Sequence, residues 1–180
     1  MLIVFIFLTG IIYPLVFTGI AQVVFPYQAN GSQLTRNGQA VGSALIGQQF
    51  DQPKYFWGRL SDSGDHAYDA SASSGSNFSV LNPSLIDAAN QRIKDLKAAD
   101  PGNTLPIPVD LVTASASGLD PEISIAAARY QENRVAKARG LSVDKIENLI
   151  DQNTQGRILG FLGEPRVNVL ELNMALDELQ

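Results

Sequence analysis

Hydrophobic positions dominate the start of the chain. The first charged side chain is Arg36, and residues 2–26 read LIVFIFLTGIIYPLVFTGIAQVVFP. A helix of roughly 20 apolar residues is long enough to cross the hydrocarbon core of a bilayer. The pattern therefore predicts a transmembrane anchor helix over residues 1–27 and a separate domain over residues 28–180. Pro14 cannot donate a backbone hydrogen bond, so it predicts a kink within the anchor.

One face of the predicted anchor differs from the rest of the helix. Residues at the spacing i, i+4, i+7 and i+11 share a face, and here they are Gly10, Pro14, Phe17 and Ala21. Mostly small residues allow another helix to approach closely. We therefore predict a membrane-helix packing face, the alternative being a lipid-exposed helix with Gln22 at the interface.

The apolar run also has an alternative interpretation as a cleaved signal peptide. Signal peptides begin with basic residues and have a shorter apolar stretch than this one. No Lys or Arg precedes the run here, so we predict an uncleaved anchor. Because no basic residue precedes the helix, the positive-inside rule gives little help in predicting its orientation in the membrane.

Beyond the anchor, apolar residues recur at helical spacing behind residues that cap helices. Asparagine, serine and aspartate are favoured caps, and proline suits the first helical position. The predicted helices begin at Asn82, Asp120, Ser142 and Asn168. The first extends to Asp100 and the second ends at Gly140, because glycine commonly follows a helix.

Short apolar or aromatic runs predict a few strands. They are residues 44–46, 55–57 and 111–113. Between them, residues 60–78 are rich in Ser, Gly, Asp and Ala, and a segment of this composition is typical of a long surface loop. The predicted fold class is α+β: one N-terminal transmembrane helix followed by a helix-rich domain with a few short strands.

Composition narrows the classes of function. Acidic side chains outnumber basic ones, 18 to 13, and no basic cluster is present, which argues against nucleic acid as a partner. The absence of cysteine excludes disulfides, thiolate metal sites and thiol catalysis. Neither a P-loop nor the Gly-x-Ser-x-Gly hydrolase elbow occurs in the sequence.

The remaining candidate chemistry lies in the polar loop. His66 is the single histidine, and Ser63, Asp65 and Asp69 are close to it in sequence. Members of a catalytic triad meet through the fold rather than through adjacency, so a solvated loop histidine is the plainer interpretation. The loop carboxylates lack the alternating spacing of an EF-hand calcium loop. We therefore predict neither catalytic residues nor a metal site, and keep a membrane-anchored extracytoplasmic hydrolase using His66 as an alternative.

A third hypothesis is an anchored structural protein of the adhesin or pilin type. Against it, no acidic residue occurs in the first helix, where a pilin carries one.

Residues 155–168 form an unusual segment, because three glycines, a proline and charged residues interrupt an apolar stretch. Such a loop can hold Glu164 and Arg166 in a fixed geometry. The alternative is a tight connection with a surface ion pair, worth at most about 1 kcal/mol.

Several sequence motifs recur together and in order in one known family. They lie at residues 13–15, 25–32, 42–48, 55–59, 74–77, 82–83, 108–121 and 163–170. The most extensive are PVDLVTASASGLDP at 108–121 and GEPRVNVL at 163–170. By these motifs the chain resembles the C subunit of the Kdp-type potassium-transporting ATPases of bacteria and archaea.

The resemblance implies a single-pass subunit in the cytoplasmic membrane, with its main domain extracytoplasmic. Family members assemble with a channel-like potassium-translocating subunit, a P-type ATPase subunit and a small single-helix subunit. The complex takes up potassium at the expense of ATP. The C subunit is described as an assembly factor and as a catalytic chaperone that raises the ATP affinity of the ATPase subunit.

The resemblance also implies that ATP and potassium act at the level of the complex, with no cofactor bound by this chain alone. The chain lacks the Asp-Lys-Thr-Gly-Thr phosphorylation motif and the Thr-Val-Gly-Tyr-Gly type of selectivity filter. We therefore expect a non-catalytic subunit of the pump.

Docking or structural roles are expected where the family motifs are densest. The residues are Trp57, Gly58, Arg59, Ser117, Gly118, Asp120, Pro121, Gly163, Glu164, Pro165, Arg166 and Asn168. Two positions depart from the family pattern, since Glu122 and Ile125 stand where His and Pro are expected. Family members usually carry a basic residue or a short polar stretch before the anchor, whereas here Leu2 follows Met1 directly, which raises the suspicion of an incomplete N-terminus.

Overall fold

The structure is a computed structural model that describes residues 1–179. They form two compact units, Met1–Leu45 and Ile46–Gln180. The boundary after residue 27, at which the predicted anchor ends, stays a prediction.

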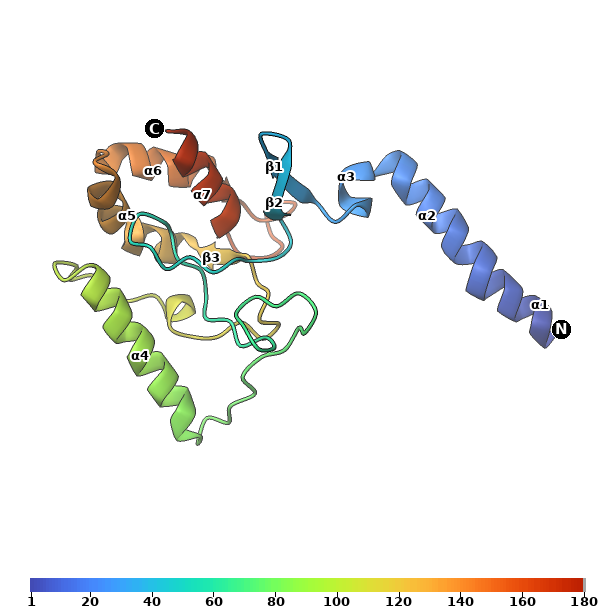
Figure 1. Ribbon diagram of the computed structural model, residues 1–180, viewed down its shortest axis with the longest axis horizontal. Helices are drawn as coiled ribbons and strands as arrows, with labels where there is room; N and C mark the ends of the chain where they lie inside the picture. The colour runs from blue at the N-terminus through green and yellow to red at the C-terminus, as the bar shows by residue number, and fades with distance from the viewer. Residues whose placement is uncertain (180) are drawn as a thin grey trace. The chain divides into compact units, whose positions relative to one another are not determined.

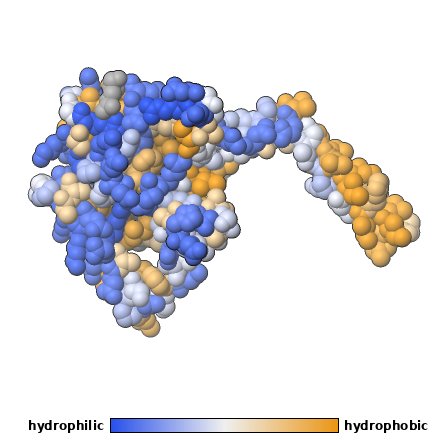
Figure 2. All heavy atoms as spheres, viewed as in Figure 1, coloured by the Kyte–Doolittle hydropathy of each residue, from blue (hydrophilic) through white to orange (hydrophobic). Residues whose placement is uncertain are grey.

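The first unit begins with an apolar helix whose span, Leu2–Val24, is long and apolar enough to cross a membrane, with a mean hydropathy of 2.3. Hydrophobic side chains cover it (Figure 2). It consists of α1 (Leu2–Phe7), a π-helical turn η1 (Leu8–Ile12) and α2 (Tyr13–Val24). The wide turn ends at Ile12, two residues before Pro14, which cannot donate to the preceding turn. Because Gly10 lies within this turn and Pro14 lies beyond it, the ideal α-helical spacing does not hold between them, and the packing face stays a prediction.

A short helix α3 (Pro26–Ala29) and a hairpin complete the first unit. Strands β1 (Gln33–Arg36) and β2 (Gln39–Ser43) pair antiparallel around Asn37 and Gly38, both at positive φ. An Asn-Gly pair is the favoured turn for a tight hairpin. The strand predicted at 44–46 is wrong, since β2 ends at Ser43 and the Leu45 side chain is 62% exposed.

The helices of the second unit, within the described residues 46–179, are α4 (Pro83–Ala99), α5 (Ile125–Arg139), α6 (Val143–Gln152) and α7 (Val169–Glu178). Figure 1 shows their arrangement. Asn82 and Asn168 cap α4 and α7, accepting from Ser84 N at 3.0 Å and Glu171 N at 3.1 Å. Gly140 ends α5 in the left-handed conformation, with φ of 66°. The helices predicted from Asn82, Ser142 and Asn168 are confirmed, as is the end at Gly140.

The predicted helix start at Asp120 is wrong. Strand β3 (Glu122–Ser124) follows it, and α5 begins at Ile125. Ser124 is the cap, because its Oγ accepts from Ala127 N at 3.0 Å. The Asp120 carboxylate instead accepts from Glu122 N, two residues along, at 3.0 Å. This Asx turn starts a strand rather than a helix because the following residues find a partner strand.

That partner is β5 (Arg166–Asn168), the central strand of a three-stranded antiparallel sheet with the order β3-β5-β4. Ile123 pairs with Val167, and both side chains are buried. Strand β4 (Thr154–Gln155) pairs with the other edge of β5. Helices α5, α6 and α7 gather around this sheet, while α4 lies apart from them (Figure 1). The fold class predicted from the sequence, α+β and rich in helix, is confirmed.

The other two predicted strands are also wrong, although their apolar residues are buried as expected. Leu111 lies in the 3-10 turn η2 (Val109–Leu111). Residues 55–57 lie outside the strands, and side-chain amides bind their backbone. Asn173 accepts from Phe56 N at 2.9 Å and donates to Phe56 O at 3.0 Å. Gln131 does the same for Trp57, at 2.8 and 3.1 Å.

Candidate functional site

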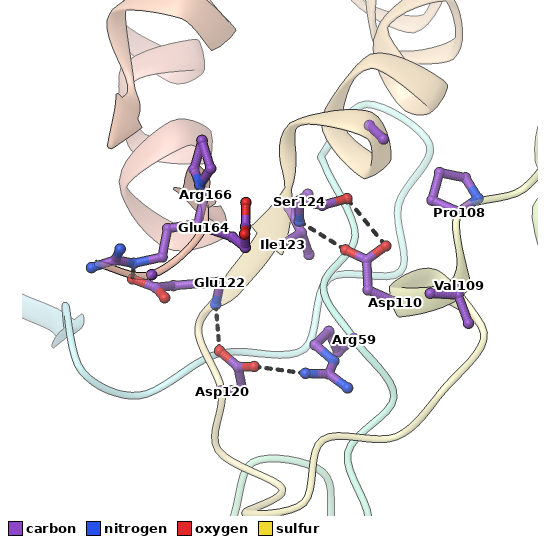
Figure 3. A pocket seen from close by; sticks show the side chains of 13 residues that line it. Arg59, Pro108, Val109, Asp110, Asp120, Glu122, Ile123, Ser124, Glu164 and Arg166 are labelled. Atoms are coloured by element: carbon purple, nitrogen blue, oxygen red, sulfur yellow. Dashed lines mark hydrogen bonds and ion pairs between the residues drawn. The ribbon is translucent and has the colours of Figure 1, made fainter. Parts of the chain in front are cut away.

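The two most extensive family motifs meet at an open cleft of about 660 Å³ (Figure 3). One wall comes from the segment around β3 and the other from the start of β5. The lining residues are Arg59, Pro108, Val109, Asp110, Asp120, Glu122, Ile123, Ser124, Ala126, Gly163, Glu164, Pro165 and Arg166. Six of the residues predicted for docking or structure therefore lie around one cleft: Arg59, Asp120, Gly163, Glu164, Pro165 and Arg166.

The Arg59 guanidinium closes one end of the cleft against Asp120. Its Nη1 lies 2.9 Å from Asp120 Oδ2, and its Nη2 donates to Ala114 O at 3.1 Å. The two charged side chains are 26% and 28% exposed. Asp120 thereby joins residue 59 to the start of β3, which ties two distant parts of the chain together (Figure 3).

A second ion pair crosses the sheet between β5 and β3. Arg166 Nε lies 2.7 Å from Glu122 Oε1, and both side chains are about 30% exposed. Glu164 instead pairs with Arg157, at 2.8 and 3.0 Å to its two oxygens. The predicted fixed geometry of Glu164 and Arg166 therefore arises from two separate pairs. At this exposure each contributes at most about 1 kcal/mol to folding.

Asp110 forms a third polar contact in the cleft (Figure 3). Its carboxylate accepts from Ser124 N at 2.8 Å and from Ser124 Oγ at 3.2 Å. The contact fastens the 3-10 turn to the N-terminal cap of α5. Asp110 was not among the residues predicted from the sequence, although it lies within the family motif at 108–121.

The remaining predicted residues lie outside the cleft lining. Trp57 is buried, with the guanidinium carbons of Arg92 and Arg134 at 5.1 and 4.4 Å from its ring centroid. Pro121 O accepts from Val169 N at 2.9 Å, and Asn168 caps α7. The structure thus gives Trp57, Pro121 and Asn168 positions inside the fold.

The three other predicted residues that lie outside the cleft lining, Gly58, Gly118 and Ser117, have small or no side chains. Gly58 is buried against Tyr68, whose hydroxyl would lie 2.6 Å from a Cβ at this position. Gly118 is buried with φ of 69°. Ser117 is exposed, and its hydroxyl lies 3.1 Å from that of Ser115.

An exposed apolar hairpin adjoins the cleft. Ile158, Leu159, Phe161 and Leu162 are 58%, 80%, 69% and 48% exposed. Ile158 and Leu162 exchange two backbone hydrogen bonds of 2.9 Å, and the Arg157–Glu164 pair closes the base. The charged residues of this segment were predicted to matter from the sequence, whereas its exposed apolar tip was not predicted. Apolar residues between closely spaced glycines were the available signal.

The polar loop residues considered for catalysis bind the loop itself. Ser63 is buried, and its Oγ accepts from Asp69 N at 2.8 Å. Asp69 accepts from both the hydroxyl and the backbone N–H of Ser71, which lowers the pKa of its carboxyl. His66 is exposed. Across residues 1–179, no three or more His, Asp or Glu side chains gather in a way that could hold a metal ion.

The family model described as "K+-transporting ATPase, c chain" and named KdpC matches residues 1–178 of this chain. The chain belongs to the KdpC family. The resemblance inferred from the sequence motifs is therefore confirmed.

Individual KdpC relatives match over nearly the whole length. A "Potassium-transporting ATPase KdpC subunit" of Herpetosiphon aurantiacus is 65% identical over 179 residues, covering 99% of this chain and 93% of the relative. One from Methylococcus capsulatus is 57% identical over 180 residues, covering 100% and 95%. One from Methylibium petroleiphilum is 62% identical over 170 residues, covering 94% and 89%.

Proposed function

We propose that this chain is an accessory subunit of an ATP-driven potassium-uptake complex, and that it serves the assembly and stability of that complex. Its relatives are named as KdpC subunits of potassium-transporting ATPases. The proposed partners are the channel-like potassium-translocating subunit, the P-type ATPase subunit and the small single-helix subunit. Its apolar helix anchors it in the cytoplasmic membrane, with the main domain extracytoplasmic.

The observation that carries the proposal is the apolar hairpin beside the cleft. Large apolar side chains that stand far into solvent on a small protein mark interaction sites. The hairpin is rigidly built, because its turn is hydrogen-bonded and an ion pair closes its base. A rigid apolar projection loses little conformational entropy when a partner covers it.

The catalytic-chaperone role belongs to the same proposal. ATP lies in the cytoplasm, whereas we propose that the main domain of this chain lies outside. We therefore propose that any rise in the ATP affinity of the ATPase subunit is transmitted through the assembled membrane subunits, with ATP and potassium bound at the level of the complex.

Substitution of the hairpin tip tests the docking role. We expect the double variant L159S/F161S to keep its fold, because both side chains are largely exposed, at 80% and 69%. Its co-purification with the other pump subunits should fall about tenfold or more, as expected when apolar anchors are removed from an interface. Pull-down in mild detergent with quantified subunit ratios measures this.

The matched control is V80S/L81S, which removes two apolar side chains that are 82% and 89% exposed in the same unit but lie outside both the hairpin and the cleft lining. The control should co-purify like the wild type. Equal recovery of partner subunits with L159S/F161S and with the control would contradict the docking role of the hairpin.

A second prediction concerns the cleft wall. We expect Arg166→Ala to lower the free energy of unfolding by at most about 1 kcal/mol, because its pair with Glu122 is partly exposed to solvent. It should nevertheless weaken assembly, since Arg166 lines the cleft beside the hairpin. Glu122→Gln breaks the same ion pair and leaves Arg166 in place, so it should assemble better than Arg166→Ala. Complete assembly and transport with Arg166→Ala would speak against a docking role for this wall.

A further inference from the structure

A small polar cavity, which Arg59 helps to line, lies within the second unit. Its volume is about 130 Å³, and it is more enclosed than the cleft. Polar side chains from the loop and from α4 line it, namely Gln48, Gln49, Arg59, Ser61, Tyr68 and Arg92. A water occupies about 30 Å³ of liquid volume, so a cavity of this size holds several waters or one small polyatomic ion.

Arg92 brings a buried positive charge to this cavity. The residue is 9% exposed. Its Nε donates to Leu111 O at 3.1 Å and its Nη2 to Gly58 O at 2.8 Å. Within residues 1–179, no carboxylate forms an ion pair with it. Buried charges are normally paired, because removing an ion from water is costly. Burial lowers the pKa of Arg92.

The neighbouring groups do not supply the missing negative charge. Arg59 adds a second guanidinium, and Asp120, which pairs with its Nη1, does not line the cavity. The buried Nε of Arg59 has no hydrogen-bond partner within residues 1–179. Tyr68 donates its hydroxyl to Arg59 O at 2.7 Å, and burial raises its pKa to about 12, so it stays neutral. Asp51 and Asp95 act on Arg92 only through longer-range attraction.

We propose that this cavity is a binding site for a small inorganic anion of chloride or phosphate type. The anion pairs with Arg92 and with Arg59, and it accepts hydrogen bonds from polar groups of the wall. The bound anion would contact three segments that line the cavity, namely residues 48–49, residues 58–61 and helix α4. The site is independent of the proposed docking function, because its lining shares only Arg59 with the cleft.

The test uses the full chain in detergent, with thermal unfolding followed by the fluorescence of its single Trp57. Potassium chloride and potassium phosphate are titrated separately against potassium gluconate at constant ionic strength. A ligand at ten times its Kd stabilises the folded state about tenfold, a rise in Tm of about 3–5 °C for a chain of this size. We expect a saturable rise with chloride or phosphate and none with the bulkier gluconate. The two titrations distinguish the two ions.

Replacing each of two alanines with leucine shows whether the stabilisation arises in the cavity. Ala67 lines the cavity, so Ala67→Leu fills it while keeping both arginines. The saturable rise should be lost in this variant. Ala70 is exposed in the same loop, and Ala70→Leu should respond like the wild type. Calorimetric titration of each variant with phosphate and with chloride gives a second measurement that does not depend on unfolding.

The alternative occupant is water alone. A wild-type Tm without saturable dependence on either anion would overturn the proposal. So would an equal anion response in wild type and Ala67→Leu, because the stabilisation would then come from the surface. Loss of the response in Ala67→Leu together with its retention in Ala70→Leu supports the site.

Discussion

Replacing Gln131 with methionine should lower the free energy of unfolding by about 4 kcal/mol. Gln131 is 1% exposed and bonds both backbone groups of Trp57. It also accepts from Arg134 Nη2 at 2.6 Å. Methionine has a similar volume and cannot form these bonds. An unpaired buried polar group costs about 1–3 kcal/mol, and this substitution leaves several.

Urea unfolding of the chain in nonionic detergent measures this loss, with Trp57 fluorescence as the probe. Trp57 is the single tryptophan and lies at the affected contact. Gln91→Met is the matched control, because Gln91 is also helical but exposed, with one bond to Asp95 at 2.9 Å. The control should change stability by no more than about 0.5 kcal/mol. A similarly small effect for Gln131→Met would mean that the hydrogen bonds between Gln131 and Trp57 contribute little to stability.

The second large effect is expected at Gly118. Its φ of 69° favours glycine, and a side chain in this conformation costs about 1–2 kcal/mol. A Cβ would also lie 2.5 Å from Ser74 O and 2.7 Å from Ser63 Cβ. Gly118→Ala should therefore destabilise the domain by about 3 kcal/mol or more. Hydrogen exchange should become faster across residues 61–77, because the loop must move away from the new methyl group.

Gly140→Ala separates backbone strain from collision. Gly140 has nearly the same φ, 66°, and a Cβ there meets nothing within 4 Å. Its substitution should cost only the strain, about 1 kcal/mol. Equal losses for the two variants would show that the loop yields freely at Gly118. A larger loss at Gly118 assigns this family-motif residue a structural role.

Signals contained within a few residues predicted the structure well. Asn82 and Asn168 cap their helices through bonds to N–H groups two or three residues further along the chain. Gly140 ends α5 through its own backbone conformation. Such features depend on neighbours in sequence, so they can be recognised without the fold.

Features that depend on distant partners were predicted poorly. Trp57 binds Gln131 across 74 positions, and Phe56 binds Asn173 across 117. An aromatic run in extended conformation has the pattern of a strand, whether another strand or two amide side chains bind its backbone. In the same way, Asp120-Pro121 has the pattern of a helix start. Residues 122–124 became a strand because residues 166–168 are available to pair with them.

The candidate site shows the same division. The sequence by itself determined the apolar helix, the capped helices, the family and the motifs that contain Arg59, Asp120 and Arg166. Only the tertiary structure decided that Arg59 pairs with Asp120, that Arg166 pairs with Glu122, and that an apolar hairpin stands beside them. The physical reason is the sequence separation of the residues that interact. Hydrophobic periodicity and helix capping involve residues within one or two helical turns of each other, whereas ion pairs and burial depend on how distant segments pack together.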